Sequence, residues 1–482
     1  MSRRRILGPF NRVEGDLEVR IEADDERILA ARVNSPLFRG FEQILVGKPP
    51  SDALVYTPRI CGICSVSQSV AAARALGAAA GVQPTPNGGL AANLILAAEN
   101  LADHLTHFYL FFMPDLARDG YSRQAWFAKV AARFKAQTGN AAPEVLRARA
   151  EFLHLTALLA GKWPHSLALQ PGGTTCPLEP AGKMELLTLL GSFRRFLEST
   201  LFADDLEAVA ALDSVEALNR WRAEQERGDF GRFLALAEAL DFDRLGRGPD
   251  HFLSYGAYEL DGEFLFRPGV WLSGAVAALD TDAIREDLSH SWLAGQSRPE
   301  HPFDGSTIPS TDESEGYSWC KAPRLDGRPM EVGALARQQV DGHPLIRDLV
   351  AHSGGNVRNR VIARLLELAR VVPRMQAWAR ALRPGEPFCR TARLPSEGQG
   401  AGLTEAARGS LGHWLRIRDG RIANYQIIAP TTWNFSPRDA EGVPGPLEQA
   451  LAGTPLAEPA LTEARIQHVI RSFDPCMVCT VH

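Results

Sequence analysis

Two Cys-x-x-Cys pairs lie at opposite ends of this 482-residue chain. The first pair is Cys61 with Cys64, and the second pair, Cys476 with Cys479, lies close to the C-terminus. Each pair can present two thiolates to one ion, so a shared metal would bring both ends of the chain to one point inside the fold. A site of this kind argues against a string of independent units, and we expect a single domain over residues 1–482.

The composition is that of an ordinary soluble globular protein, with 45% hydrophobic residues, 23% charged residues and a formal net charge of −5. Such a charge gives no reason to expect binding to nucleic acid or to an anionic membrane. No apolar run approaches the ~18 residues that cross a bilayer. The basic start, Ser2 to Arg5, is not followed by the apolar segment of a secretion signal. These features predict a cytoplasmic location, unless a partner carries the targeting signal.

The chain has seven cysteines, an odd number that argues for metal or redox chemistry and against a disulfide scaffold. The three cysteines outside the pairs, Cys176, Cys320 and Cys389, are expected to be small buried hydrophobic residues. For the two pairs, spacing alone leaves three interpretations open: structural zinc, an iron–sulfur cluster and a thiolate-bound catalytic metal.

Hydrophobic periodicity predicts a mainly α protein with small antiparallel β pieces, which is an α+β fold class. Alternating residues predict a hairpin over 17–33, and Asp419-Gly420 suits a two-residue turn between strands at 414–418 and 421–428. Helices are predicted at 65–82, 87–113, 121–137, 143–161, 183–202, 215–240, 356–382 and 461–472. Residues 245–337, rich in Gly, Pro and aromatic residues, predict loops with short strands. The first Cys pair directly precedes a predicted helix, whose free N–H groups favour thiolates there.

The residues around the two pairs resemble the large subunit of nickel-iron hydrogenases. The front motif of that family, Arg-x-Cys-Gly-x-Cys, matches Arg59 to Cys64, and its terminal motif, Asp-Pro-Cys-x-x-Cys-x-x-His, matches Asp474 to His482. Other blocks occur in the family's order at 12–15, 38–42, 103–109, 170–173, 317–324, 405–409 and 425–434, and together they span nearly the whole chain. The resemblance implies the hydrogenase large-subunit fold, a central bundle of long helices with both termini meeting at a buried metal site.

By this resemblance the chain is the catalytic subunit that cleaves H2 heterolytically into protons and electrons. Cys61, Cys64, Cys476 and Cys479 would hold nickel, with Cys64 and Cys479 bridging to an iron that carries one CO and two cyanide ligands. Because too few cysteines remain to hold iron–sulfur clusters as well, electrons must leave through a cluster-bearing small subunit. A heterodimer, or a dimer of heterodimers, is therefore expected.

The resemblance also assigns groups that handle the proton and the open coordination site. Cys476 would accept the proton first, and Glu14, from the Arg-x-Glu-Gly block, would accept it next. Arg408 would lie over the open site, with Asp115 and Asp474 orienting it. Without the family motifs, the sequence would indicate that Glu14 is a surface carboxylate and that Arg408 is a solvated or salt-bridged arginine.

Two further assignments concern a cyanide ligand and a second metal. Thr431 would donate a hydrogen bond to a cyanide, which is a polar ligand in an apolar pocket. Glu42, a backbone carbonyl near Ile427, and His482 match the family's second site, usually magnesium, because such hard cations prefer oxygen ligands. The alternative is a buried pair of His and Glu without metal.

The sequence departs from the common family pattern at three positions near the first Cys pair and the long helix. Gln68 stands where a histidine is common, and an amide can donate a hydrogen bond to a bridging thiolate but cannot relay a proton. Ile63 and Phe111 stand where many relatives carry Val and Leu. These larger side chains would narrow a gas channel, although ordinary core variation explains them equally. The chain also ends at His482, without the extension that most family precursors carry.

Together these departures resemble the regulatory, H2-sensing branch of the family. The predicted role is an H2 sensor of low turnover that signals to a histidine kinase. One alternative is an uptake hydrogenase that supplies electrons to metabolism. An alternative of another class is a zinc-stapled scaffold without redox activity.

Overall fold

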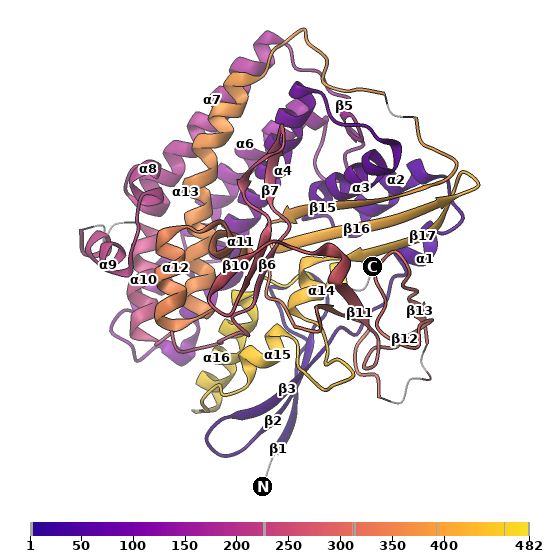
Figure 1. Cartoon of the computed structure of the whole chain (residues 1–482). Coiled ribbons are helices and arrows are strands. Elements are labelled where there is room, and N and C mark those ends of the chain that lie inside the picture. The colour runs from indigo at the N-terminus through magenta and orange to yellow at the C-terminus, as the bar shows by residue number, and fades with distance from the viewer. Residues whose placement is uncertain are drawn as a thin grey trace.

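Long helices form one side of the molecule and an antiparallel sheet extends through the other, as Figure 1 shows for the computed structural model. The structure describes residues 3–224, 228–310, 312, 315–391, 393–456 and 458–480. Four long helices pack on one another: α4 (Pro86–Thr106), α6 (Ala141–Ala160), α7 (Pro180–Phe196) and α13 (Val357–Ala381). The predicted central bundle of long helices is confirmed.

Helix α4 is buried along almost its whole length and forms the centre of this bundle. The hydroxyl of Thr85 accepts a hydrogen bond from the Gly88 N–H at 3.1 Å, and Pro86 occupies the first helical position, where its missing N–H costs nothing. The helix then continues as a π-helical turn, His107–Phe112, and a 3-10 turn, Met113–Ala117. Wide turns of this kind often lie at functional sites. They redirect the chain after α4, so the regular helix is shorter than the one predicted at 87–113.

The central sheet consists of β15 (Gly398–Ala406), β16 (Gly409–Arg418) and β17 (Arg421–Ile428), paired antiparallel in that order. The predicted hairpin is confirmed: Asp419 and Gly420 both have positive φ, 50° and 68°, as a two-residue type I′ turn requires. The sequence analysis did not predict β15, which packs on α3 (Ser65–Ala80). A Cβ at Gly402 would lie 1.9 Å from the Ala71 carbonyl oxygen, so glycine lets the helix approach the strand.

A second three-stranded sheet lies at the N-terminus and projects at the bottom of Figure 1. The predicted hairpin is formed by β2 (Glu18–Ala23) and β3 (Ile28–Asn34), and β1 (Arg3–Leu7) adds an unpredicted edge strand. Alternate residues of β2, including Val19 and Ile21, are buried, which agrees with the predicted alternation.

Several predicted helices have different boundaries. The helix predicted at 121–137 is reduced to α5 (Phe127–Phe134), and α7 ends at Phe196 before a π-helical turn, Leu197–Phe202. The helix predicted at 215–240 is divided into α9 (Val215–Glu224) and α10 (Asp229–Ala239), with residues 225–227 outside the described part. The unpredicted helices are α1 (Phe41–Leu45), α2 (Ala53–Tyr56), α8 (Leu206–Ala210), α11 (Ala334–Asp341), α12 (Pro344–Ser353), α14 (Pro430–Asn434), α15 (Pro446–Leu451) and α17 (Met477–Thr480).

Short strands connect these elements, as predicted for residues 245–337. They are β6 (Phe252–Ser254), β7 (Ala257–Leu260), β8 (Glu263–Phe266), β9 (Gly269–Leu272), β10 (Ala275–Ala277), β11 (Ile284–Asp287), β12 (Leu293–Ala294), β13 (Ile308–Pro309) and β14 (Ala322–Leu325), with β4 (Leu169–Gln170) and β5 (Gly173–Thr174) earlier in the chain. Within the described ranges, no helix combines the length and the apolar character needed to cross a bilayer.

The C-terminal segment enters the molecule beside the N-terminal one. After α16 (Pro459–Ser472), the chain runs into α17, which packs beside α14. Glu14 and Cys476 form a parallel β-bridge, and the Met477 N–H donates to the Glu14 carbonyl at 2.7 Å. Gly15 has φ +83°, and a Cβ there would lie 3.0 Å from Val478 Cγ1, so a side chain would push the two segments apart.

Candidate metal centre

The four paired cysteines meet inside the protein. Their sulfur atoms all lie within 4.8 Å of one another, and all four residues are buried. The closest pairs are Cys476 with Cys479 at 3.0 Å, Cys64 with Cys479 at 3.2 Å, and Cys61 with Cys476 at 3.5 Å. Pairs this close suit one or two ions with metal–sulfur bonds of about 2.3 Å. The prediction that a shared site joins the two ends of the chain is confirmed in its geometry.

The N-terminus of α3 holds the front pair, and Cys64 is the residue that precedes its first turn. The side chain of Cys64 caps no N–H group of the helix; a buried carboxylate on α4 does so instead. Glu99 accepts hydrogen bonds from the Val66 N–H at 2.7 Å and from the Ser67 N–H at 2.9 Å. The sulfur of Cys64 is therefore left available to a metal, and α3 is tied to α4 close to the site.

The charges of the four sulfurs fit a metal. Hydrogen bonds from Cys476, Cys479 and Cys64 hold the pKa of Cys61 well below its ordinary value. Hydrogen bonding to Cys476 and Cys479, with burial, raises the pKa of Cys64, and burial raises the pKa of Cys476. A soft divalent metal supplies the positive charge that lets all four ionise, so the donor set fits nickel and iron.

Glu14 lies at the edge of this cluster, half-buried, because its backbone pairs with Cys476. Burial raises the pKa of its carboxyl group, and the nearby Cys61 thiolate raises it further, while Arg408 and Arg39 oppose this shift. A carboxyl group with a raised pKa beside cysteine sulfurs is a candidate for proton exchange with them.

Arg408 is buried between two carboxylates. Its Nε donates to the Asp474 carbonyl oxygen at 2.9 Å, and Nη1 lies 3.0 Å from Asp103 Oδ2. Nη2 lies 3.1 Å from Asp103 Oδ1 and 3.3 Å from Asp474 Oδ1. Although burial acts against the charge, Asp103 and Asp474 raise the pKa of Arg408 well above its ordinary value. The predicted contact between Arg408 and Asp474 is present.

The assignment of Asp115 as a partner of Arg408 is wrong. Asp115 is fully buried and pairs with three other arginines: Arg12, Arg118 at 2.7 Å, and Arg471. The π-helical turn after α4 rotates the chain, so Asp115 faces the terminal helix α16. Asp103, within α4, takes the position beside Arg408. Its place in a long apolar helix, where an unpaired carboxylate would be costly, was the signal in the sequence.

Thr431 and Gln68 both lie beside the cysteines, with partners that the sequence did not predict. The Thr431 hydroxyl oxygen accepts a hydrogen bond from the Cys476 N–H at 3.0 Å, which leaves its proton available for another acceptor. Gln68 is fully buried on α3, and its Oε1 lies 2.7 Å from Nε2 of His413.

A buried polar cluster surrounds Glu42. Its carboxylate accepts from the Ile427 N–H at 2.7 Å and from Lys321 Nζ at 2.8 Å, and it also contacts the Thr307 hydroxyl. Lys321 also pairs with Glu286. The predicted neighbours Glu42 and Ile427 are therefore adjacent, whereas His482 lies outside the described residues.

Ile63 and Phe111 are each half-buried. Ile63 packs against the hydrophobic cluster that contains the four cysteines, and Phe111 lies in the π-helical turn. Of the other cysteines, Cys320 is fully buried as predicted, whereas Cys176 and Cys389 are only partly buried. That part of the prediction is wrong.

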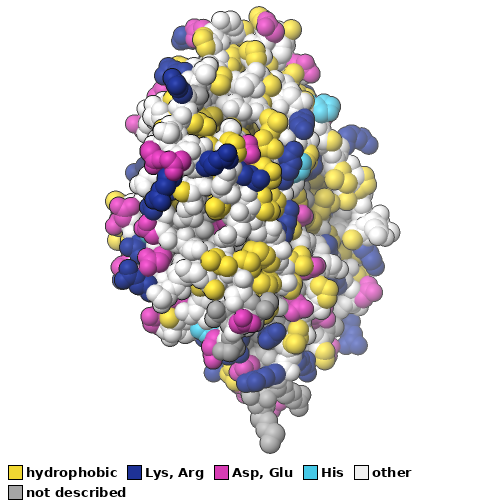
Figure 2. Space-filling view, turned by 90° about the vertical axis from the view of Figure 1, so that its right-hand side faces the viewer, with side chains coloured by type: hydrophobic (Ala, Val, Ile, Leu, Met, Phe, Trp, Pro, Cys, Tyr) yellow, Lys and Arg dark blue, Asp and Glu magenta, His cyan; other side chains and the backbone are white. Residues whose placement is uncertain are grey.

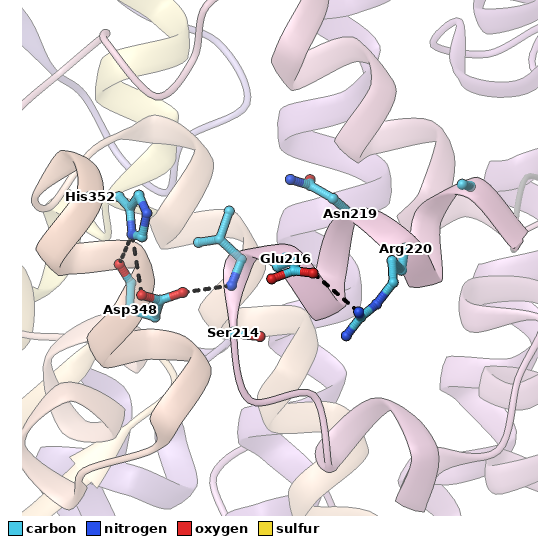
Figure 3. Close-up of a pocket in the computed structure, with 8 residues that line it drawn as sticks. Ser214, Glu216, Asn219, Arg220, Asp348 and His352 are labelled. Atoms are coloured by element: carbon cyan, nitrogen blue, oxygen red, sulfur yellow. Dashed lines mark hydrogen bonds and ion pairs between the residues drawn. The ribbon is translucent and has the colours of Figure 1, made fainter.

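A separate surface hollow of about 630 Å³ lies between α9 and α12, far across the molecule from the central sheet in Figure 1. Asp348 accepts a hydrogen bond from the Val215 N–H at 2.7 Å. Figure 3 shows Asp348 in contact with His352. These contacts secure the start of α9 against α12, and we assign no chemistry to this hollow.

The fold and the site define a metalloprotein whose buried thiolates hold a soft transition metal. Residues 39–116 and 143–482 match the family model described as nickel-dependent hydrogenase. The chain belongs to the nickel-dependent hydrogenase family, as its catalytic large subunit, and the four cysteines are the site of the nickel–iron centre. This membership contradicts the alternative of a zinc-stapled scaffold without redox activity.

Similar proteins span the full chain. The large subunit of the periplasmic [NiFeSe] hydrogenase of Desulfomicrobium baculatum is 30% identical over 99% of this chain and 94% of that protein. The uptake hydrogenase large subunit of Rhodobacter capsulatus is 28% identical over 100% of this chain and 95% of its own length. The Ni-Fe-Se hydrogenase from D. vulgaris Hildenborough, in its as-isolated oxidized state, superposes with a TM-score of 0.86 and 28% identity, with complete coverage of both chains.

Substitutions of Asp103 and Asp115 are expected to have different effects on activity and stability. Asp103→Asn removes a charged partner of Arg408, so H2 oxidation per nickel should fall about 10- to 100-fold, which corresponds to about 1.5–3 kcal/mol. Asp115→Asn removes the carboxylate that pairs with the buried Arg471 and with the partly exposed Arg12 and Arg118, so it should lower the free energy of unfolding by ~3–5 kcal/mol. Dye-linked H2 oxidation, normalised to nickel, and thermal unfolding measure the two effects. An equal loss of activity per nickel in Asp115→Asn would contradict this assignment.

Proposed function

We propose that this hydrogenase large subunit serves as an H2 sensor in the cytoplasm and passes its state to a histidine kinase. The observation that carries the proposal is Gln68, which is buried one turn after Cys64 and hydrogen-bonded to His413. An amide there cannot relay protons as the more common histidine can, so it favours a site that responds to H2 over one built for rapid turnover.

The nickel–iron centre, when bound, supplies the heterolytic cleavage of H2. We assign Cys64 and Cys479 as the ligands shared with an iron that carries CO and cyanide, which the 3.2 Å separation of their sulfurs supports. Cys476 accepts the released proton and Glu14 takes it next. The β-bridge between Glu14 and Cys476 supports this order, because it fixes the carboxyl group beside that cysteine.

Other residues orient and shield the site. Arg408, held by Asp103 and Asp474, places a positive charge beside the cysteines and lies over the open coordination position. The Thr431 hydroxyl, fixed through the Cys476 N–H, donates to a cyanide. Ile63 and Phe111 narrow the path by which gas reaches the site.

We assign the polar cluster around Glu42 to Mg²⁺, with the backbone carbonyl of Ile427 and the His482 side chain as further ligands. The presence of two buried glutamates, Glu42 and Glu286, beside Lys321 supports this assignment, because carboxylate oxygens are the ligands that a hard cation prefers.

An iron–sulfur small subunit is the partner that carries electrons away. Figure 2 shows the face on which α1 and α2 lie in Figure 1, and hydrophobic side chains gather in a band across its middle. Leu37, Ile44, Val46 and Val55, all shortly before the front cysteines, are between 37% and 45% exposed. Exposed apolar residues grouped near a redox centre support docking of a protein partner there.

An uptake hydrogenase that feeds electrons to metabolism is the second candidate. The observation that favours it is the similarity over the full chain to the uptake hydrogenase large subunit of Rhodobacter capsulatus.

Glu14→Gln should slow the exchange of H2 with D2O by about 10²-fold or more, because the amide cannot accept the proton. Nickel content should stay at the parent level. The matched control is Glu22→Gln, which changes a half-buried carboxylate that pairs with Arg4 on the N-terminal sheet. Exchange at the parent rate in Glu14→Gln would show that another group accepts the proton.

The sensor proposal predicts slow dye-linked H2 oxidation that persists in oxygen, and a histidine kinase that co-purifies with the heterodimer. Fast H2 oxidation that oxygen readily stops, without a bound kinase, would contradict the sensor role and support the uptake role.

A further inference from the structure

A chain of three buried side chains runs from the central sheet to the metal centre. The Tyr425 hydroxyl lies 2.8 Å from Nδ1 of His413, and Nε2 of His413 lies 2.7 Å from Oε1 of Gln68. All three residues are no more than 1% exposed.

The chemistry of these atoms fixes the direction of each hydrogen bond. A carbonyl oxygen only accepts, so Nε2 of His413 must carry the proton that it donates to Gln68. In a neutral imidazole the other nitrogen is then an acceptor, so Nδ1 accepts a hydrogen bond from the Tyr425 hydroxyl. The tyrosine therefore selects the tautomer of the histidine, and the histidine selects the orientation of the amide.

The sheet places these side chains accurately. His413 on β16 is opposite Ile427 on β17, so Tyr425 is its diagonal neighbour on the same face, with ring centroids 5.6 Å apart. On the other side of β16, His413 is opposite Gly402 of β15. The missing side chain of Gly402 lets α3 lie against the sheet, which brings Gln68 within reach of His413.

Because its oxygen faces His413, the amide group of Gln68 directs its NH2 away from the sheet. Gln68 follows Cys64 by four residues, a spacing that places both on one face of the helix. We propose that His413 and Tyr425 are positioning residues that hold the Gln68 NH2 on the face of α3 that carries Cys64, from which it would donate a hydrogen bond to the Cys64 thiolate when the metals are bound. This inference rests on the proposed role of Cys64 as a ligand shared with iron.

A thiolate that accepts this hydrogen bond passes less charge to iron, so loss of the donor should lower the stretching frequency of the iron-bound CO. The test is infrared spectroscopy of the purified heterodimer carrying single substitutions. Gln68→Met, which keeps the length of the side chain but has no N–H donor, should lower the CO frequency. Tyr425→Phe should lower it in the same direction, because His413 is then free to take the other tautomer and turn the amide.

A second buried tyrosine–histidine pair in this protein provides a matched control. The Tyr121 hydroxyl lies 3.0 Å from Nε2 of His468, and both residues lie on different elements from Tyr425, His413 and Gln68. Tyr121→Phe should leave the CO band at the parent position. His413→Gln keeps a donor for Gln68 and should also stay near the parent position, whereas His413→Leu should lower the frequency.

The outcomes test separately whether His413 and Tyr425 orient the Gln68 amide and whether Gln68 lies beside an iron-bound thiolate. If Gln68→Met shifts the CO band while Tyr425→Phe and His413→Leu do not, His413 and Tyr425 do not orient the amide and the inference is wrong. If Gln68→Met leaves the band unchanged, the assignment of Gln68 beside an iron-bound thiolate fails instead. The two His413 variants provide the same comparison if Tyr425→Phe does not retain the metals.

Discussion

The structure depends on the charge of four sulfur atoms gathered in a dry interior. Ionised thiolates at 3.0–3.5 Å from one another repel strongly where little water screens them. Arg408 is a buried cation beside them that also pairs with the carboxylates of Asp103 and Asp474, so its single charge offsets only part of the negative charge that four thiolates would carry. A bound metal would supply the positive charge that four ionised thiolates need at this separation, and it would add to the backbone contacts that already hold the two ends together.

Packed helices and backbone segments position the cysteines at the metal centre. Glu99 fixes the start of α3 to α4 and thereby places Cys64, while the close approach at Gly15 brings the terminal segment beside Glu14. The terminal segment pairs with Glu14 through Cys476 and with Arg408 through Asp474, so both groups lie near the cysteines. The acid–base chemistry is thus a consequence of how the two ends of the protein pack together. The central sheet adds the hydrogen-bonded side chains of Tyr425 and His413, which end at Gln68.

Features that depend on local pattern could be predicted from the sequence. The cysteine pairs, the long helices and the Asp419-Gly420 turn follow from spacing, periodicity and turn chemistry, and the structure confirms them. Contacts between residues that are far apart in the sequence could not be predicted. The family resemblance places Asp115 beside Arg408, but the π-helical turn after α4, which helical periodicity does not reveal, is followed by Asp115 pairing with Arg471 instead. Lys321 and His413 each contact a residue more than 100 positions away, Glu42 and Gln68 respectively.

The central claim is that the four cysteines hold a nickel–iron centre with diatomic ligands. Elemental analysis combined with infrared spectroscopy of the same purified heterodimer tests it most directly. We predict nickel together with iron, and stretching bands of CO and cyanide that disappear when Cys479 is replaced by serine. Zinc in place of nickel, with no such bands in the parent protein, would contradict the account.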